Sequence, residues 1–177
     1  MPAAPSPAAA LAADPALADD PALADDPALA ALRRRFGTHF IVITRVWRRA
    51  ADLRLAPLGL SHATASALLL LRHQPGSGIR QGALAAALSI EQPSLVPLLD
   101  QLGAAGLVER RPDPADRRAR SLHLTEAGHA AAAAADSALE ALRAEVLQGC
   151  DAGELAIAMQ VLERMAANLG REPGDLA

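Results

Sequence analysis

The sequence IEQPSLVPLLDQL, residues 90–102, begins the stretch that decides the fold of this chain. It places Leu95, Leu98, Leu99 and Leu102 at positions i, i+3, i+4 and i+7, the spacing of one apolar stripe along a helix. The stripe predicts a helix that packs on a core. The other side of this helix carries short polar or small side chains, namely Gln92, Ser94, Val96 and Gln101. The simplest interpretation is an ordinary amphipathic surface helix.

A charged hairpin is predicted directly after this helix. Residues 103–106 (GAAG) are expected to end the helix, and LVERR at 107–111 then alternates as a strand does. Turn residues PDPAD follow at 112–116, and a second strand is expected at 120–124. The hairpin gathers five arginines, which are Arg110, Arg111, Arg117, Arg118 and Arg120.

These two elements together have the form that reading of duplex DNA requires. The major groove is wide enough to admit a helix with small polar side chains. An arginine at a hairpin tip suits a narrow, electronegative minor groove. Charged hairpin tips are also common as plain solvated surface, so the hairpin taken alone leaves both interpretations open.

Charge is divided unevenly along the chain in a way that favours a nucleic-acid partner. The whole chain has a net charge of -3, but its first 30 residues hold five Asp and no basic residue. Residues 31–125 hold 14 arginines against six acidic residues, a net charge of +8. The chain has only two Phe, one Trp and no Tyr, so stacking of single-stranded bases on aromatic side chains is not expected. Duplex DNA is the expected partner.

The same stretch resembles the MarR family of bacterial transcription regulators and is especially similar to its SlyA-like branch. The resemblance is carried by IEQPSLV at 90–96, LLDQL at 98–102, GLV at 106–108, DRRA at 116–119 and LTE at 124–126, with RVWR at 45–48 through LS at 60–61. It implies a mainly α fold with a small β-wing. The expected parts are a winged helix-turn-helix at about 61–125 and dimerisation helices at about 29–55 and 126–170, within one MarR-type domain at 29–177.

By this resemblance the protein is a sequence-specific regulator, expected to be a repressor, that binds a palindromic double-stranded DNA operator as a homodimer. The implied DNA-binding residues are Gln92, Pro93, Ser94, Val96, Pro97 and Gln101 on the helix, with Arg110, Asp116, Arg117 and Arg118 in the hairpin. Arg117 is expected in the minor groove, with Asp116 and Arg118 bracing the wing.

Pro97 is the main departure from the SlyA-like pattern, which typically has an arginine at this position. Proline inside a helix removes a backbone hydrogen bond and typically costs ~3 kcal/mol, so a bend between Pro93 and Pro97 is predicted. The alternative function is therefore a MarR-like dimeric interaction protein whose DNA binding is weakened or lost.

The resemblance also implies a crevice between the first two helices and the helix-turn-helix, where small aromatic acids often bind and relax DNA affinity. Arg45, Arg48 and His62 are the candidates for binding such a carboxylate. Ala65 and Leu69 stand where the SlyA-like branch often has a tryptophan and a histidine. The expected crevice is therefore roomier and less polar.

The two end segments carry long apolar stripes that one chain does not need. Residues 29–55 show a helical stripe from Leu29 to Leu53, and residues 155–169 repeat the pattern after Asp151, a predicted N-cap. Between them, Ser61 is predicted to cap a helix at 62–73, and 79–89 is predicted as the first helix of the helix-turn-helix, with Ile79 inward. The end helices are expected to pair with those of a second subunit.

The remaining segments predict no chemistry of their own. Residues 1–28 repeat Ala, Asp and Pro and are predicted to be a disordered acidic tail; the alternative is a tail that competes with DNA for the arginines. The five histidines fit no metal-ligand spacing, and no phosphate loop or nucleophile motif stands out, so no enzyme, metal or cofactor is expected. The lone Cys150 is interpreted as structural. Without a signal peptide or a membrane-spanning apolar run, the protein is expected in the cytoplasm.

Overall fold

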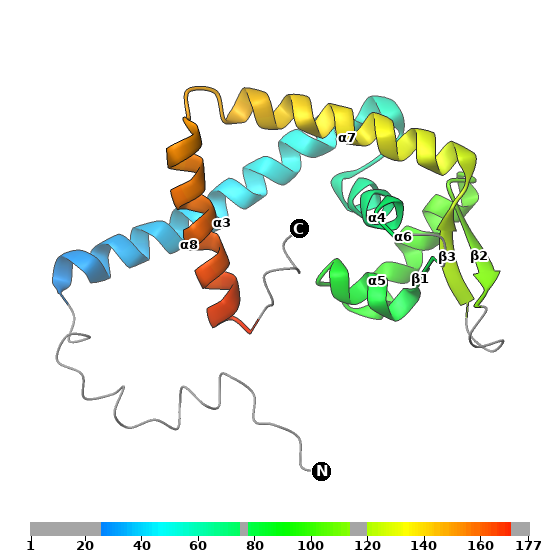
Figure 1. Cartoon of the computed structure of the whole chain (residues 1–177), viewed down its shortest axis with the longest axis horizontal. Coiled ribbons are helices and arrows are strands. Elements are labelled where there is room, and N and C mark those ends of the chain that lie inside the picture. The colour runs from blue at the N-terminus through cyan, green and yellow to red at the C-terminus, as the bar shows by residue number, and fades with distance from the viewer. Residues whose placement is uncertain (1–25, 75–77, 114–119, 171–177) are drawn as a thin grey trace, which may run out of the picture. The chain divides into compact units, whose positions relative to one another are not determined.

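The structure is a computed structural model that describes residues 26–74, 78–113 and 120–170. The elements of the chain, in order, are α3 (Pro27–Leu55), the 3-10 helix η1 (Ala56–Leu58), α4 (His62–Arg72), β1 (Ile79–Arg80), α5 (Gln81–Ala87), α6 (Gln92–Ala104), β2 (Val108–Pro112), β3 (Arg120–Leu124), α7 (Glu126–Val146) and α8 (Ala152–Asn168) (Figure 1). The expected mainly α fold with a small β-wing is confirmed. Two compact units divide the chain: residues 44–148 form one, and residues up to 43 with those from 149 onward form the other.

The wing is part of a three-stranded antiparallel sheet with strand order β1-β3-β2. Val108 pairs with Leu124 and Pro112 with Arg120, as the predicted hairpin requires. The third strand is a correction, because Ile79 was expected in a helix and instead pairs with Leu122 in β1. Arg80 is extended (φ -71°, ψ 146°) and caps α5, so the helix starts only at Gln81. The strand still buries Ile79, which is 8% exposed.

Helix starts in this chain follow the predicted caps. The Ser61 hydroxyl accepts from the Thr64 backbone N–H, and the Thr64 side chain accepts in return from the Ser61 N–H. Asp151 and Glu154 make the same reciprocal arrangement at the start of α8. Both predicted caps are confirmed. Each satisfies two backbone N–H groups that have no partner inside the helix.

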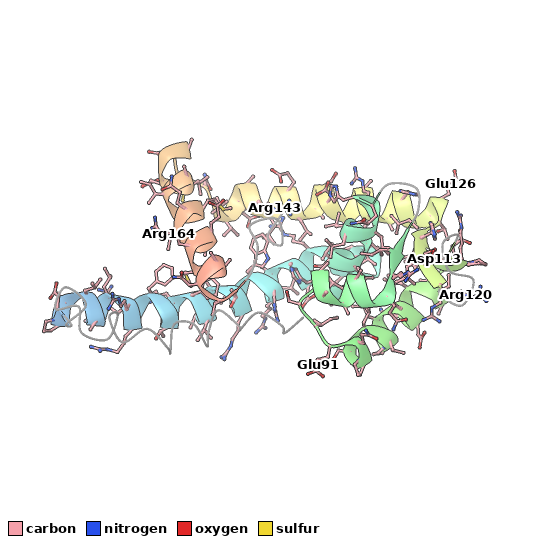
Figure 2. All side chains as sticks on the ribbon, turned by 60° about the horizontal axis from the view of Figure 1, so that its bottom comes forward. Glu91, Asp113, Arg120, Glu126, Arg143 and Arg164 are labelled. Carbon is pink, nitrogen blue, oxygen red and sulfur yellow. The ribbon has the colours of Figure 1, made fainter. Side chains whose placement is uncertain are left out.

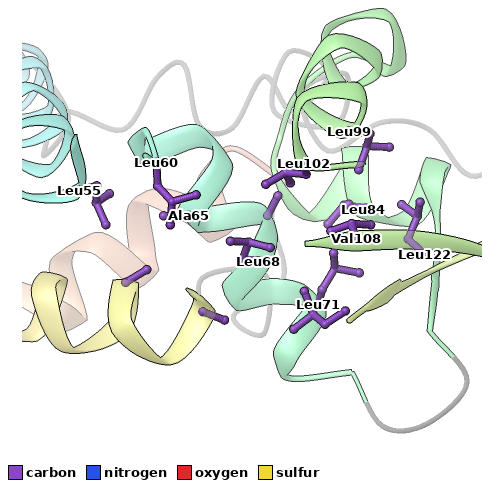
Figure 3. Close-up of a cluster of buried hydrophobic side chains, with 14 of the residues drawn as sticks. Leu55, Leu60, Ala65, Leu68, Leu71, Leu84, Leu99, Leu102, Val108 and Leu122 are labelled. Carbon is purple, nitrogen blue, oxygen red and sulfur yellow. The ribbon is translucent and has the colours of Figure 1, made fainter. Parts of the chain in front are cut away.

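Residues 44–148 share one apolar core. Five leucines are fully buried in it: Leu68 of α4, Leu84 of α5, Leu95 and Leu102 of α6 and Leu122 of β3. Figure 3 shows Leu68, Leu84, Leu102 and Leu122 between the helices and the sheet. Burying a leucine side chain stabilises a fold by about 1.5–3 kcal/mol, so these positions hold α6 firmly in place.

Small residues allow α7 to approach the rest of this core. α7 packs on α4 (Figure 1), and its Ala132 and Ala135 are fully buried. Gly128 lies in the first turn of α7, and a Cβ added there would be 2.0 Å from the Leu107 carbonyl oxygen. The Thr125 hydroxyl accepts from the Gly128 N–H at 3.0 Å and donates to the Gly106 carbonyl at 2.7 Å. The start of α7 is thus held directly against the loop that leads into β2.

Helix α6 is longer than the sequence predicted. GAAG at 103–106 was expected to end it, yet Gly103 and Ala104 are helical and the left-handed glycine is Gly106, with φ 69°. The helix is also uninterrupted at Pro97, which lies inside it. The predicted bend between Pro93 and Pro97 stays a prediction.

The other unit contains the first half of α3 together with α8, and it leaves large apolar side chains exposed. On α3 these residues include Leu32, Phe36, Phe40 and Ile43, and on α8 Ile157, Met159 and Leu169. Phe36 and Phe40 stack with ring centroids 6.5 Å apart. The stripes predicted for the end helices therefore lie at the surface of this single chain.

Two further expectations concern the ends and the membrane. α3 begins at Pro27, so the predicted tail at 1–28 overlaps its first two residues, and residues 1–25 lie outside the described residues. Among the residues that the structure describes, no single helix is long and apolar enough to cross a membrane. Two bent helix pairs reach that length and apolar character only when their two helices are taken together.

Candidate nucleic-acid interface

Helices α5 and α6 meet in the manner of a helix-turn-helix. Their axes are bent by 107° across the break at 88–91. Helices crossing at about 90–120° over a turn of three to four residues are typical of this motif. Ser89 takes the left-handed conformation in the turn, with φ 55°, and the Ile90 N–H donates to the Ala85 carbonyl at 3.0 Å. The predicted motif is present, with α6 as its second helix.

The two sides of α6 differ as predicted. Leu95, Leu99 and Leu102 are buried, and Leu98 is half-buried. The six residues of α6 that were predicted to contact DNA are all exposed: Gln92, Pro93, Ser94, Val96, Pro97 and Gln101. The side of α6 that faces away from the core thus presents uncharged polar and small apolar groups.

Asp100 is the one charged residue of α6, and it is bound by the hairpin. Arg110 of β2 donates from Nη2 to Asp100 Oδ1 at 3.1 Å. Arg110 lies on the same face of the hairpin as Val108, Leu122 and Arg120, because residues of one strand alternate between faces and partners share one. A hollow of about 370 Å³ between α6 and the strands is lined by both members of the pair. The predicted DNA-binding Arg110 is therefore oriented by α6.

A second ion pair braces the base of the wing. Arg80 Nε donates to Asp113 Oδ2 at 2.7 Å, and the Asp113 side chain is only 12% exposed. Figure 2 shows Asp113 and Arg120 at the hairpin end of the molecule. Sequence reasoning missed this pair, since neither the strand β1 nor its place beside β3 was predicted. Asp116, Arg117 and Arg118 lie at 114–119, outside the described residues.

A pocket of about 330 Å³ lies among α3, α4 and the helix-turn-helix. Its lining consists of Arg48, Asp52, Ser61, His62, Ala63, Ser66, Leu88, Ile90 and Leu98. Of the predicted ligand-binding residues, Arg48 and His62 line it. Arg45 is exposed, Ala65 is fully buried and Leu69 is half-buried, and none of these three belongs to the lining.

Asp52 is the pocket residue that sequence reasoning missed. Its Oδ1 accepts from the backbone N–H of His62 at 2.7 Å, so it holds the start of α4 against α3. The signal was its position four residues after Arg48, on the same side of the helix. Burial is the largest cause that lowers the pKa of His62 from its ordinary value of 6.5; the charge of Arg48 lowers it further, and the Asp52 carboxylate opposes both. The neutral imidazole is thereby favoured.

Among the residues that the structure describes, no group of three or more His, Cys, Asp or Glu side chains is placed to hold a metal ion. Cys150 is exposed at the turn between α7 and α8.

Comparisons with known proteins agree on one family. A sequence model described as the MarR family matches residues 58–119. The transcriptional regulator PA3341, known from a crystal structure, is 39% identical in sequence to this chain, with a TM-score of 0.69. The match covers 76% of this chain and 98% of that one. CouR from Rhodococcus jostii RHA1, bound to p-coumaroyl-CoA, is 27% identical over 74% of this chain and 91% of that one, with a TM-score of 0.68. A mutant MarR from E. coli, complexed with operator DNA, is 26% identical over 74% and 93%, with a TM-score of 0.67.

The electrostatics of the pocket can be tested on His62 directly. In the full chain, the His62 ring should titrate below pH 6.5 when followed by NMR, because burial and Arg48 disfavour its protonated form. Arg48→Ala should raise this pKa, and Asp52→Asn should lower it. His62→Gln assigns the resonance. Titration at or above pH 6.5 in the unmodified chain, or shifts of opposite sign in the variants, would contradict the described pocket.

Proposed function

The chain belongs to the MarR family of transcriptional regulators, and we propose that it is a sequence-specific repressor. It acts as a homodimer on a palindromic double-stranded DNA operator in the cytoplasm. The observation that carries this proposal is the arrangement of α5 and α6. They meet at 107°, and α6 exposes an uncharged polar side next to a hairpin rich in arginine. The proposal is further supported by the similarity to a MarR structure that contains operator DNA.

In this proposal α6 enters the major groove and the wing enters the minor groove. Gln92, Ser94 and Gln101 present hydrogen-bonding groups to base edges, and Val96 presents a methyl surface suited to thymine. Arg117 at the wing tip enters the narrow minor groove, and Asp116 and Arg118 brace the tip. Arg110, oriented by Asp100, contacts the phosphate backbone between the two grooves.

The homodimer is proposed from the exposed stripes on α3 and α8. Monomeric proteins rarely expose large contiguous apolar patches, and such patches mark interaction sites. A hollow of about 570 Å³ against α3 is lined by Phe36, Thr38, His39, Phe40, Val42 and Ile43. A second copy of the chain supplies an equal stripe and also the twofold axis that a palindromic operator matches.

An effector is proposed for the pocket lined by Arg48 and His62. These side chains supply positive charge or a donor for a carboxylate, while Leu88, Ile90 and Leu98 supply an apolar wall for a small aromatic ring. The similarity to CouR bound to p-coumaroyl-CoA supports an aromatic ligand class. Because Leu88 and Ile90 lie in the turn of the helix-turn-helix, a ligand here displaces the groups that set the angle of α6.

The motif IEQPSLV at 90–96 further supports placement in the SlyA-like branch; grouping of the chain with another branch in a sequence tree would reject that placement. The competing proposal is a dimeric interaction protein without DNA binding, and Pro97 in α6 is the observation that favours it.

Binding of the chain to the DNA upstream of its own gene separates these two functions. In a fluorescence anisotropy titration, the full chain should bind this duplex more tightly than a scrambled one. Arg117→Ala should weaken binding by roughly 1–3 kcal/mol if a base-edge contact is lost. Arg164→Ala, in α8 outside the helix-turn-helix, is the matched control and should leave affinity unchanged. Equal affinity for both duplexes would reject the regulator, and an unchanged Arg117→Ala affinity and salt slope would make the wing tip ordinary solvated surface.

The oligomeric state tests the proposed interface. Sedimentation equilibrium should report two copies of the 18.3-kDa chain per particle. Deletion of residues 151–177 removes α8 and uncovers apolar surface, so we expect aggregated or unfolded protein. Deletion of residues 171–177 alone, which leaves α8 whole, is the control and should preserve the dimer. A stable, soluble monomer after the longer deletion would disprove the pairing of the end helices between two subunits.

Release of the operator by small aromatic acids tests the pocket. Benzoate and 4-hydroxycinnamate, titrated into the preformed complex, should lower its anisotropy. Arg48→Ala should raise the acid concentration needed by about tenfold, since a charge-assisted hydrogen bond is lost. Arg45→Ala is the control, because Arg45 lies three residues away on the same helix but does not line the pocket. Equal sensitivity of the Arg48→Ala complex, or no release by either acid, would reject this effector class.

A further inference from the structure

Pro97 changes the hydrogen bonding of α6 at one defined place. In an α-helix each backbone N–H donates to the carbonyl four residues earlier. Proline has no N–H, and Pro97 lies inside α6, which runs from Gln92 to Ala104. The Pro93 carbonyl oxygen, in the first turn of α6, therefore has no N–H donor from the helix, and the Pro97 ring stands beside it where that N–H would be.

This carbonyl lies on the side of α6 that faces away from the core. Successive residues turn by about 100° around a helix, so Pro93 and Pro97 lie nearly opposite Leu95 and Leu99. Both prolines are exposed, whereas Leu95 is fully buried and Leu99 is 3% exposed. The oxygen that Pro97 leaves without a helical donor thus belongs to the face proposed to enter the major groove.

The other hydrogen-bonding groups on this face of α6 discriminate less among bases than a backbone carbonyl does. α6 contains no arginine, lysine or histidine, and its one carboxylate, Asp100, is bound by Arg110. Glutamine amides and the serine hydroxyl both donate and accept, so they adapt to several bases. A backbone carbonyl only accepts and is held by the helix. It is the most selective hydrogen-bonding group that α6 offers to a base edge.

Desolvation makes this acceptor selective. Pro93 is exposed, so in the free protein water can donate to its carbonyl oxygen on the side away from the Pro97 ring. Close docking on DNA removes that water, and an acceptor left without a donor is costly. In the major groove, adenine and cytosine present amino donors, whereas guanine and thymine present acceptors. We propose that the Pro93 carbonyl, freed by Pro97, accepts a hydrogen bond from the exocyclic amino group of an adenine or cytosine in each half-site. This inference rests on the proposed function and adds a specificity determinant to it.

The test is the base preference of the full chain, measured by selection of duplexes from a randomised pool and then by titration of single-base variants of the selected site. Every base pair carries one such amino group, on its adenine or its cytosine, so the preference concerns which strand carries it. The unmodified chain should require adenine or cytosine on one given strand at one position per half-site. Binding should be about tenfold weaker when guanine or thymine stands there, because the amino group then lies on the other strand. Pro97→Ala restores the N–H to the Pro93 carbonyl without adding charge. Its preference at that position should fall to about twofold or less.

Two controls separate the carbonyl from general effects on the helix. Gly103→Ala also stabilises α6, and its added Cβ would meet nothing closer than the Val108 carbonyl oxygen at 3.9 Å, so it should keep the full preference. Pro97→Arg restores the same N–H and should lose the preference while steepening the salt dependence, if its guanidinium meets a phosphate.

Each outcome decides the inference. A Pro97→Ala chain that keeps the tenfold preference would overturn it. So would an unmodified chain that, at every position facing α6, binds equally well whichever strand carries the adenine or cytosine. Loss of the same preference in Gly103→Ala would also overturn it, because helix stiffness would then be the cause. If the unmodified chain selects no duplex at all, the proposed function itself fails, and that result differs from a site that is bound without this preference.

Discussion

The packing of α6 on the sheet and on α4 is the constraint from which the proposed reading surface follows. Leu95, Leu99 and Leu102 are buried in one cluster with Leu68 and Leu122, so α6 can neither rotate nor slide without uncovering apolar surface. Because that side is fixed, the opposite side is fixed as well. The exposed residues between Gln92 and Gln101 share one orientation because the leucines on the opposite side of α6 are buried. A helix-turn-helix needs this rigidity, since base edges are read at hydrogen-bond distances.

Charge and shape are divided between two neighbouring elements. α6 carries no cation, while the hairpin carries arginines, and the Arg110–Asp100 and Arg80–Asp113 pairs join the hairpin to the helix-turn-helix. The Arg110–Asp100 pair is exposed on both sides, and such a pair contributes at most about 1 kcal/mol to stability. The value of the two pairs in this protein is orientation, because each limits where an arginine side chain can point. Long-range attraction to phosphate then comes from the wing, and discrimination among bases comes from α6.

The pocket links these elements to α3. Arg48 and Asp52 lie on α3, and His62 begins α4. Leu88 and Ile90 lie in the turn between α5 and α6, and Leu98 lies on α6 itself. A molecule bound there contacts both the helix that leads to the proposed interface and the helix proposed to read DNA. Ligand binding can change DNA affinity only through different contacts in the two states, and a pocket shared by both helices provides them.

By itself, the sequence determined the local features of this protein. Leucine spacing predicted α6 and its buried side, Ser61 and Asp151 predicted two helix starts, and the residues flanking the turn at 112–116 predicted both hairpin strands. These features depend on neighbours within a few residues, and the residues themselves carry the signal. Only the tertiary structure decided which distant residues meet. Ile79 and Arg80 form a strand because they pair with the edge of β3. Gly103 is helical because α6 packs on β2. Asp52 lines the pocket because the start of α4 lies against α3. Such contacts depend on how the chain closes on itself, and no short stretch of sequence records that.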